Sequence, residues 1–261
     1  MIQSGVGSTE PPNSGGAGSA GAAVVSERRI LSAEDREIEK DVASIADEFR
    51  YGFEVVAQLP KPAVTLFGSA RVPEGHAAYE AARSAGRQFA ERGWTVVTGG
   101  GPGAMEAGNR GAKEGGGVSV GFNIRLPHEQ GTNPYVDVGV VFNHFYARKV
   151  CFAKAAEGFV VFPGGFGTMD ELFEALTLIQ TGKLFHFPVV LVGSDYWEEL
   201  LAWVRDEALR GGMIAPADLE LVTVTDDPAE AVETVIACYE RRCAHEVVEE
   251  AARAASEADA Q

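Results

Sequence analysis

Hydrophobic positions alternate along the chain between short unbroken runs and longer stretches in which they recur every three or four residues. The short runs predict strands. They are Ala63–Phe67, Trp94–Thr98, Val118–Phe122, Val138–Phe142, Gly158–Phe162, Val189–Val192 and Leu221–Val224. The longer stretches predict helices. They include Ala77–Arg92, Ala104–Glu114, His144–Ala156, Met169–Thr181, Tyr196–Arg210 and Pro228–Arg241. Apolar strands that alternate with helices predict an α/β fold, a mostly parallel sheet with helices on both faces.

This alternation defines one α/β domain at residues 61–245, and the composition changes on either side of it. Residues 1–25 are mostly Gly, Ser, Ala and Pro. Such a segment buries too little apolar surface to offset the entropy of ordering, so we predict a disordered tail. Residues 246–261 are rich in Ala and Glu with little apolar periodicity, and we predict a frayed helix or a tail there.

Residues 26–60 are predicted to contain an accessory helix. Ser32-Ala33-Glu34-Asp35 has the composition of a capped helix start. The apolar residues that follow at helical spacing are Ile38, Val42, Ile45 and Phe49. We expect this helix, Ser32–Arg50, to pack on the main domain or on a partner subunit.

The charge balance and the cysteines exclude several classes. The formal net charge is −16, and because nucleic-acid affinity depends on Lys and Arg, we expect no nucleic-acid polymer as a partner. No apolar run approaches the roughly 20 residues that span a bilayer, so we expect no membrane partner. No Lys or Arg precedes Arg28, so a signal peptide is not predicted. Cys151, Cys238 and Cys243 fit neither a disulfide framework nor a zinc site, which favours a cytoplasmic protein.

Two glycine-rich segments indicate a binding function. Thr98–Met105 and Phe162–Thr168 each follow a predicted strand and open a predicted helix. Glycines let backbone N–H groups approach a ligand closely, and a helix N-terminus favours an anion such as phosphate. Because ligands of parallel sheets bind at the carboxyl ends of strands, the two segments together predict a nucleotide site.

Two common nucleotide motifs do not fit. Gly99–Ala104 matches the dinucleotide pattern G-x-G-x-x-A, but the next strand ends in Gly121-Phe122-Asn123 without the acidic residue that binds a ribose hydroxyl. No Gly-Lys-Ser or Gly-Lys-Thr occurs in the chain, which excludes a P-loop. Kinase chemistry is therefore not predicted.

The second glycine segment reads Pro163-Gly164-Gly165-Phe166-Gly167-Thr168-Met169-Asp170-Glu171 and resembles the PGGxGTxxE motif of the LOG family, the cytokinin-activating phosphoribohydrolases often mislabelled "lysine decarboxylase". Arg148-Lys149 is similar to the family's Arg-Lys pair. The segments Gly99–Glu106 and Phe67–Ala70 resemble its other strand-end turns. The resemblance covers about Val64 to Ile236, and the N-terminal helix is similar to the longer bacterial branch.

The resemblance implies a Rossmann-like fold, a homodimer or higher homo-oligomer, and no metal or organic cofactor. It implies hydrolysis of the N-glycosidic bond of a nucleoside 5′-monophosphate, a cytokinin riboside 5′-monophosphate or AMP, to free base and ribose 5-phosphate. It implies that Arg148 and Glu171 are the catalytic pair. The substrate-binding candidates are Gly68, Ser69, Gly99, Gly100, Gly101, Gly103, Met105, Glu106, Lys149, Gly164, Gly165, Gly167 and Thr168.

Cleavage of a C1′–N bond builds positive charge on the ribose, and a carboxylate near C1′ stabilises that charge or orients the attacking water. We assign this role to Glu171. Arg148 either clamps the phosphate or polarises the leaving base. Taken alone, Thr168-x-x-Glu171 has the pattern of a capping box, with Thr168 as N-cap, and Arg148 alone would be a solvent-facing helix cation.

Two other classes stay open on the same scaffold: a non-catalytic carrier of a nucleotide or the molybdenum cofactor, and a nucleotide-sensing oligomer. Phe145, Tyr146 and Phe166 are expected in the core, with stacking on a base as the alternative. Asn109 is expected to be a polar group on a helix face. The histidines lack paired ligand spacing, and no nucleophile elbow occurs. Nothing around Lys149, Lys154 or Lys183 indicates a Schiff-base lysine.

Overall fold

The computed structural model describes residues 35–126 and 131–258 and contains a seven-stranded parallel sheet in the order β4-β3-β2-β1-β5-β6-β7. The strands are β1 Ala63–Phe67, β2 Thr95–Thr98, β3 Ser119–Ile124, β4 Val138–Phe142, β5 Phe159–Val161, β6 Val189–Val192 and β7 Val222–Thr225. The predicted α/β fold is confirmed. The chain adds strands outward from β1 to β4 and then returns to place β5 on the other side of β1, so the order of the strands reverses between β1 and β5 while all strands stay parallel.

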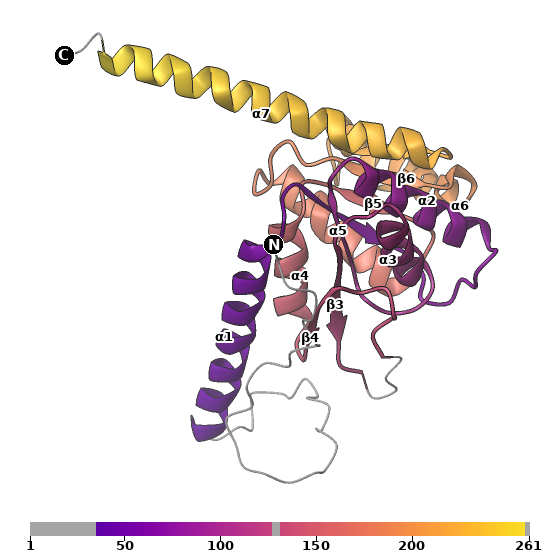
Figure 1. Cartoon of the computed structure of the whole chain (residues 1–261). Coiled ribbons are helices and arrows are strands. Elements are labelled where there is room, and N and C mark those ends of the chain that lie inside the picture. The colour runs from indigo at the N-terminus through magenta and orange to yellow at the C-terminus, as the bar shows by residue number, and fades with distance from the viewer. Residues whose placement is uncertain (1–34, 127–130, 259–261) are drawn as a thin grey trace.

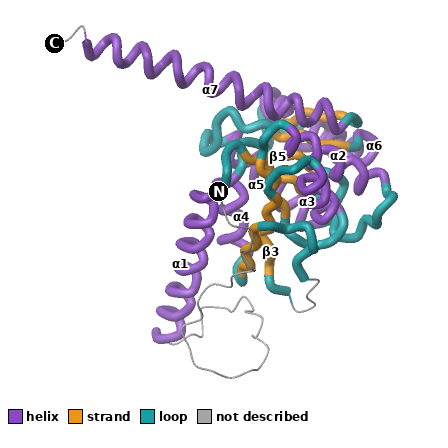
Figure 2. The backbone as a smooth tube through the Cα atoms, in the orientation of Figure 1, coloured by secondary structure: helices purple, strands orange, loops and turns teal. Residues whose placement is uncertain are grey.

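Seven α-helices surround this sheet in the described part of the chain (Figures 1 and 2). They are α1 Asp35–Gln58, α2 Ala77–Glu91, α3 Ala104–Glu114, α4 Phe145–Ala155, α5 Phe166–Gln180, α6 Ser194–Trp203 and α7 Pro228–Ala258. A π-helical segment, Val204–Leu209, continues α6, and a 3₁₀ segment, Pro216–Leu221, precedes β7. Among the described residues, no helix combines the length and the apolar character needed to cross a bilayer.

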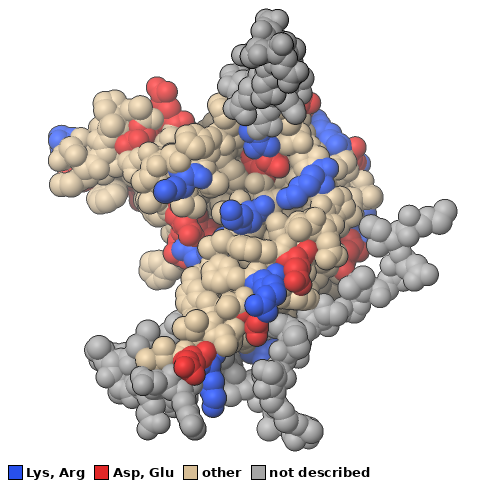
Figure 3. Space-filling view, turned by 90° about the vertical axis from the view of Figure 1, so that its left-hand side faces the viewer, with Lys and Arg blue, Asp and Glu red and all other residues tan. Residues whose placement is uncertain are grey.

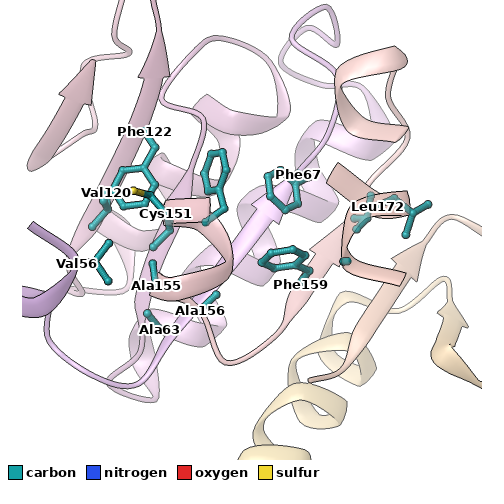
Figure 4. Packing of buried hydrophobic residues seen from close by; sticks show 14 of the residues in the cluster. Val56, Ala63, Phe67, Val120, Phe122, Cys151, Ala155, Ala156, Phe159 and Leu172 are labelled. Atoms are coloured by element: carbon teal, nitrogen blue, oxygen red, sulfur yellow. The ribbon is translucent and has the colours of Figure 1, made fainter. Parts of the chain in front are cut away.

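The helices form two apolar layers, one on each face of the sheet. Helices α1, α4, α5 and α6 pack on one face, and α2, α3 and α7 pack on the other. Strand β1 shows why both layers form, because Phe67 contributes to the first layer and Val64 and Leu66 to the second. Figure 4 shows the first layer, in which Phe67 and Phe159 lie between α4 and Leu172 of α5.

The flanking helices extend further than predicted. The accessory helix begins at Asp35 and runs to Gln58, eight residues beyond Arg50, because Val56 and Leu59 are also buried against the domain. At the other end, α7 continues through residues 246–258 and projects away from the sheet (Figure 1). The predicted disordered tail, residues 1–25, lies outside the described residues.

Candidate functional site

Three turns meet at the carboxyl edge of the sheet, because the strands that precede them, β2, β1 and β5, are neighbours. Ser69 in the turn after β1 joins the other two. Its amide donates to the carbonyl of Pro163, at 3.0 Å, and its carbonyl accepts from the amide of Ala104, at 2.9 Å. The two glycine segments of the sequence therefore form one continuous backbone surface at the point where the strand order reverses.

Several glycines of this surface are required by space. A Cβ at Gly68 would lie 2.6 Å from the Cβ of Ala104. A Cβ at Gly164 would overlap the hydroxyl of Thr168, and one at Gly103 would overlap the carbonyl of Ser69. Gly103 also has a φ of 69°, which side-chain-bearing residues rarely adopt. By contrast, a Cβ at Gly165 would have nothing within 4 Å.

A buried amide network holds the first glycine loop. Asn109 accepts from the hydroxyl of Thr98 at 2.6 Å and from the side chain of Asn133 at 2.9 Å. Asn133 in turn donates to the carbonyl of Gly101, and its backbone amide donates to the carbonyl of Gly100. Asn109 lies on α3, and its side chain is fully buried on the face of that helix that packs on the sheet. Asn133 was not predicted at all, and its only sequence signal is a Gly-Thr-Asn-Pro turn.

Arg148 lies against this loop and is partly buried. Its Nε donates to the carbonyl of Phe122 at 2.7 Å, and its guanidinium lies over the ring of Phe152, 5.1 Å from the centroid. A Cβ at Gly99 would overlap the guanidinium. Burial lowers the pKa of Arg148 to about 10, although the nearby Glu171 opposes that shift. Arg148 is therefore a fixed cation beside the glycine loop, and the alternative of a solvent-facing helix cation is wrong.

Glu171 lies in the second turn of α5 and is 6% exposed. Burial raises the pKa of Glu171 to about 7, and the positive charges of Arg148 and Lys149 partly offset this effect. The carboxylate accepts no hydrogen bond from a described residue and makes no direct ion pair with Arg148. The structure thus places the two predicted catalytic residues near each other while leaving both able to contact a ligand.

The start of α5 differs from the capping-box alternative. The helix begins at Phe166 with Gly165 as its N-cap, so Thr168 is the third helical residue and caps nothing. Its hydroxyl instead lies over Gly164. The amides of Gly165, Phe166 and Gly167 donate to no acceptor among the described residues. Free amides at a helix N-terminus are donors for an anion.

The remaining predicted residues are divided between the site and its surroundings. The thioether of Met105 lies beside Gly99 and Gly101, inside the first loop. Glu106 accepts from the hydroxyl of Tyr79 at 3.0 Å. Lys149 forms ion pairs with Asp170 and Glu174, each at 2.9 Å, and so ties α4 to α5.

Aromatic side chains next to the site are exposed rather than in the core. Phe166 is 96% exposed, and Phe145 and Tyr146 on α4 are 46% and 38% exposed. Phe166 and Phe173 line a groove on α5 that Lys149 also borders. The core prediction for Phe145, Tyr146 and Phe166 was therefore wrong, because helices α4 and α5 turn these side chains outward. On the face in Figure 3, basic and acidic side chains lie interspersed among other residues.

The fold and these turns define an α/β protein with two glycine loops joined at the carboxyl edge of its parallel sheet. A family model described as "Possible lysine decarboxylase" matches residues 105–235. The chain belongs to this family, the LOG family.

Two relatives illustrate the similarity. A cytokinin riboside 5′-monophosphate phosphoribohydrolase of Mycobacterium tuberculosis is 33% identical over 156 residues, which cover 59% of this chain and 82% of the relative. A probable enzyme of the same name from rice, Oryza sativa subsp. japonica, is 37% identical over 149 residues, 55% of this chain and 59% of the relative. The chain thus spans little more than half of the rice protein's length.

Solved structures share the fold. The Moco carrier protein of Chlamydomonas reinhardtii is 26% identical with a TM-score of 0.51, and the match covers 69% of this chain and 99% of that protein. The molybdenum cofactor binding protein of Rippkaea orientalis has the same TM-score at 22% identity, covering 69% and 98%.

The crowding at Gly103 predicts unequal effects of alanine at two glycines. Gly103→Ala combines a positive φ with backbone overlap and should lower the free energy of unfolding by about 2–4 kcal/mol. Gly165→Ala enters open space and should change it by less than about 1 kcal/mol. Urea denaturation followed by tryptophan fluorescence measures both, and equal losses would contradict the geometry.

The buried Glu171 predicts a pH-dependent gain in stability for Glu171→Gln. The unfolded carboxyl ionises near pH 4.5 and the folded one near 7, so stability falls as pH rises between these values. Glutamine removes this effect, and at pH 8 the variant should be about 1–3 kcal/mol more stable than the wild type. The gain should vanish below pH 4.5 in urea titrations. Glu91→Gln, which changes an exposed carboxylate on α2, is the control and should show no such pH-dependent gain. A gain in stability of Glu171→Gln that stays constant with pH would contradict the raised pKa assigned to Glu171.

Proposed function

We propose that this protein hydrolyses the N-glycosidic bond of a nucleoside 5′-monophosphate and releases free base and ribose 5-phosphate. The observation that carries the proposal is the buried Glu171 next to Arg148 and two glycine loops. Family membership and the names of the relatives support it. A cytokinin riboside 5′-monophosphate or AMP is the proposed substrate.

The free amides at the start of α5 are the proposed donors to the 5′-phosphate. A phosphate held there brings the ribose toward the next turn of α5, where Glu171 lies. As the bond between C1′ and the base nitrogen breaks, positive charge develops on the ribose, and the Glu171 carboxylate stabilises it. The oxygen of a water molecule bonds to C1′, and one of its protons passes to the departing base. The water's other proton stays on the new C1′ hydroxyl. A carboxylate with a pKa of about 7 is suited to carrying the single transferred proton from the water to the base near neutrality.

The family description as a possible lysine decarboxylase receives no support from the lysines. A lysine that forms a Schiff base needs a lowered pKa. Burial of Lys149 acts in that direction, but hydrogen bonds with Asp170 and Glu174 outweigh it and raise the pKa. Lys154 and Lys183 are exposed.

A carrier function is the competing proposal, supported by the fold shared with the Moco carrier protein. The buried carboxylate argues against it. An ionised Glu171 would repel an anionic cargo, and its burial already opposes ionisation. A site that only binds phosphate gains nothing from this group, whereas bond cleavage at the ribose does.

The deciding experiment measures free base released from AMP and from isopentenyladenosine monophosphate. The wild type should release base, and Glu171→Gln should lower kcat by about 10²–10⁴-fold, because it removes the charge needed at C1′. Chromatography of the products measures both. Glu91→Gln, which changes an exposed carboxylate on α2, should behave as wild type.

Nucleotide binding without base release would favour the carrier. If Glu171→Gln released base at the wild-type rate, the proposed reaction would stand, but Glu171 would have no role in it.

We also propose that two copies of the chain associate through the groove on α5 and the neighbouring part of α4. Phe166, Phe173 and Phe145 expose apolar surface there, which isolated chains rarely leave open to water.

Sedimentation velocity of the full chain should therefore give about twice the mass of one 27.7-kDa chain. Phe173→Asp places a charge in the groove and should shift the protein to monomer. Met213→Asp alters an exposed apolar residue that lines no part of this groove and should leave the dimer intact. A monomeric wild type, or a dimer unaffected by Phe173→Asp, would contradict the proposal.

A further inference from the structure

Helix α1 packs directly on α4, the helix that carries Arg148, and the two lie side by side in Figure 1. The approach is close at Gly52, where a Cβ would lie 2.5 Å from the Sγ of Cys151 and 3.2 Å from the ring of Phe142. Val56 of α1 lies near Cys151 and Phe122 in the same apolar layer (Figure 4). The accessory helix therefore packs against α4 and β4, next to the elements that carry the site.

One charged residue of α1 enters this contact. Glu48 is 3% exposed, and its carboxylate reaches the junction between β4 and α4. Oε1 accepts from the backbone amide of Asn143 at 3.1 Å and from its side-chain amide at 2.5 Å. Oε2 accepts from the backbone amide of His144 at 3.1 Å and lies 3.2 Å from the imidazole Nδ1 of His144.

These contacts replace a local cap that α4 lacks. His144 is the N-cap residue of α4, yet its side chain makes no capping hydrogen bond, and the first turn contains no acidic residue. A carboxylate at a helix N-terminus is favourable because of the helix dipole and the free amides. Here the carboxylate comes from a helix about 95 residues earlier in the chain.

The anchored peptide is linked to Arg148 by one hydrogen bond. The amide of His144 donates to Glu48, and the carbonyl of His144 accepts from the amide of Arg148 at 3.3 Å. The backbone amide of Arg148 therefore bonds to a peptide that Glu48 holds, and the Nε of Arg148 bonds to the carbonyl of Phe122. The backbone and the guanidinium of Arg148 are thus each held by a hydrogen bond.

We propose that Glu48 is a positioning residue for Arg148, so that the accessory helix sets the geometry of the site. The proposal rests on the proposed function in its catalytic part and on the hydrogen bonds alone in its structural part. Loss of the Glu48 charge should loosen the first turn of α4 and displace the guanidinium. A displacement of about 1 Å at a reacting group lowers rates by about 10²-fold.

A double-mutant cycle tests this coupling on the full chain. Glu48→Gln keeps the size of the side chain and removes its charge, and it should lower kcat/KM for AMP by about 10–100-fold. In the Arg148→Lys background the same change should lower kcat/KM by less than about twofold, because the group that Glu48 positions is already altered. Equal losses in both backgrounds would overturn the proposal, since general destabilisation acts equally in each.

Asp47→Asn is the matched control, because Asp47 is the preceding residue of α1, is exposed and pairs with Arg50. It removes one negative charge from the same helix and should leave kcat/KM unchanged. A loss equal to that of Glu48→Gln would attribute the effect to the charge of α1 as a whole and overturn the assignment to Glu48.

Hydrogen exchange of the wild type and Glu48→Gln tests the anchor without any substrate. Amides in residues 143–148 should exchange at least about tenfold faster in the variant, while those of β6 should not change. Unchanged exchange in residues 143–148 would overturn the proposal even if activity fell. If the wild type released no base from any nucleotide, the proposed function would fail, and this measurement would still decide whether Glu48 anchors α4.

Discussion

The site depends on the backbone of Ser69. This residue lies in the turn after β1, the central strand of the three that carry the glycine turns, and its amide and carbonyl bond to the turns on either side. Both bonds require a close approach that side chains at Gly68, Gly103 or Gly164 would prevent. The glycines therefore have two separable purposes, to join three turns into one surface and to leave amides open at the helix start. Gly165 and Gly167 serve only the second purpose, since the space above them is empty.

The elements of the fold could be predicted from the sequence because each depends on a local pattern. Strands such as Val189–Val192 are unbroken apolar runs in a sheet covered on both faces, and all seven predicted strands appear in the structure. Helix ends were less predictable. The start of α5 at Phe166 follows two glycines, which are typical of a turn, and the capping pattern at Thr168 indicated a later start.

The surroundings of the site could be predicted only in part, because they arise from contacts between distant segments. Arg148 and Glu171 were predicted from the family resemblance of the motifs that contain them. The partners that determine their properties were not. Asn133 holds Asn109 from a loop 24 residues away, and Glu48 reaches His144 across 96 residues. No periodicity marks such residues, since an isolated Asn or Glu in a helix or loop has the composition of ordinary surface.

The same long-range contacts explain how two opposite charges stay apart in a poorly solvated site. A buried Arg and Glu ordinarily collapse into a direct ion pair, which satisfies both. Here Arg148 is held by the carbonyl of Phe122, the ring of Phe152 and the anchored start of α4, while Glu171 is fixed by its own helix. Burial therefore raises the pKa of Glu171, and the positive charge of Arg148 offsets that effect only in part. In the proposed reaction, the positive charge that develops on the ribose would compensate the carboxylate of Glu171. The scaffold that keeps Arg148 from pairing with Glu171 would then matter as much as Arg148 itself.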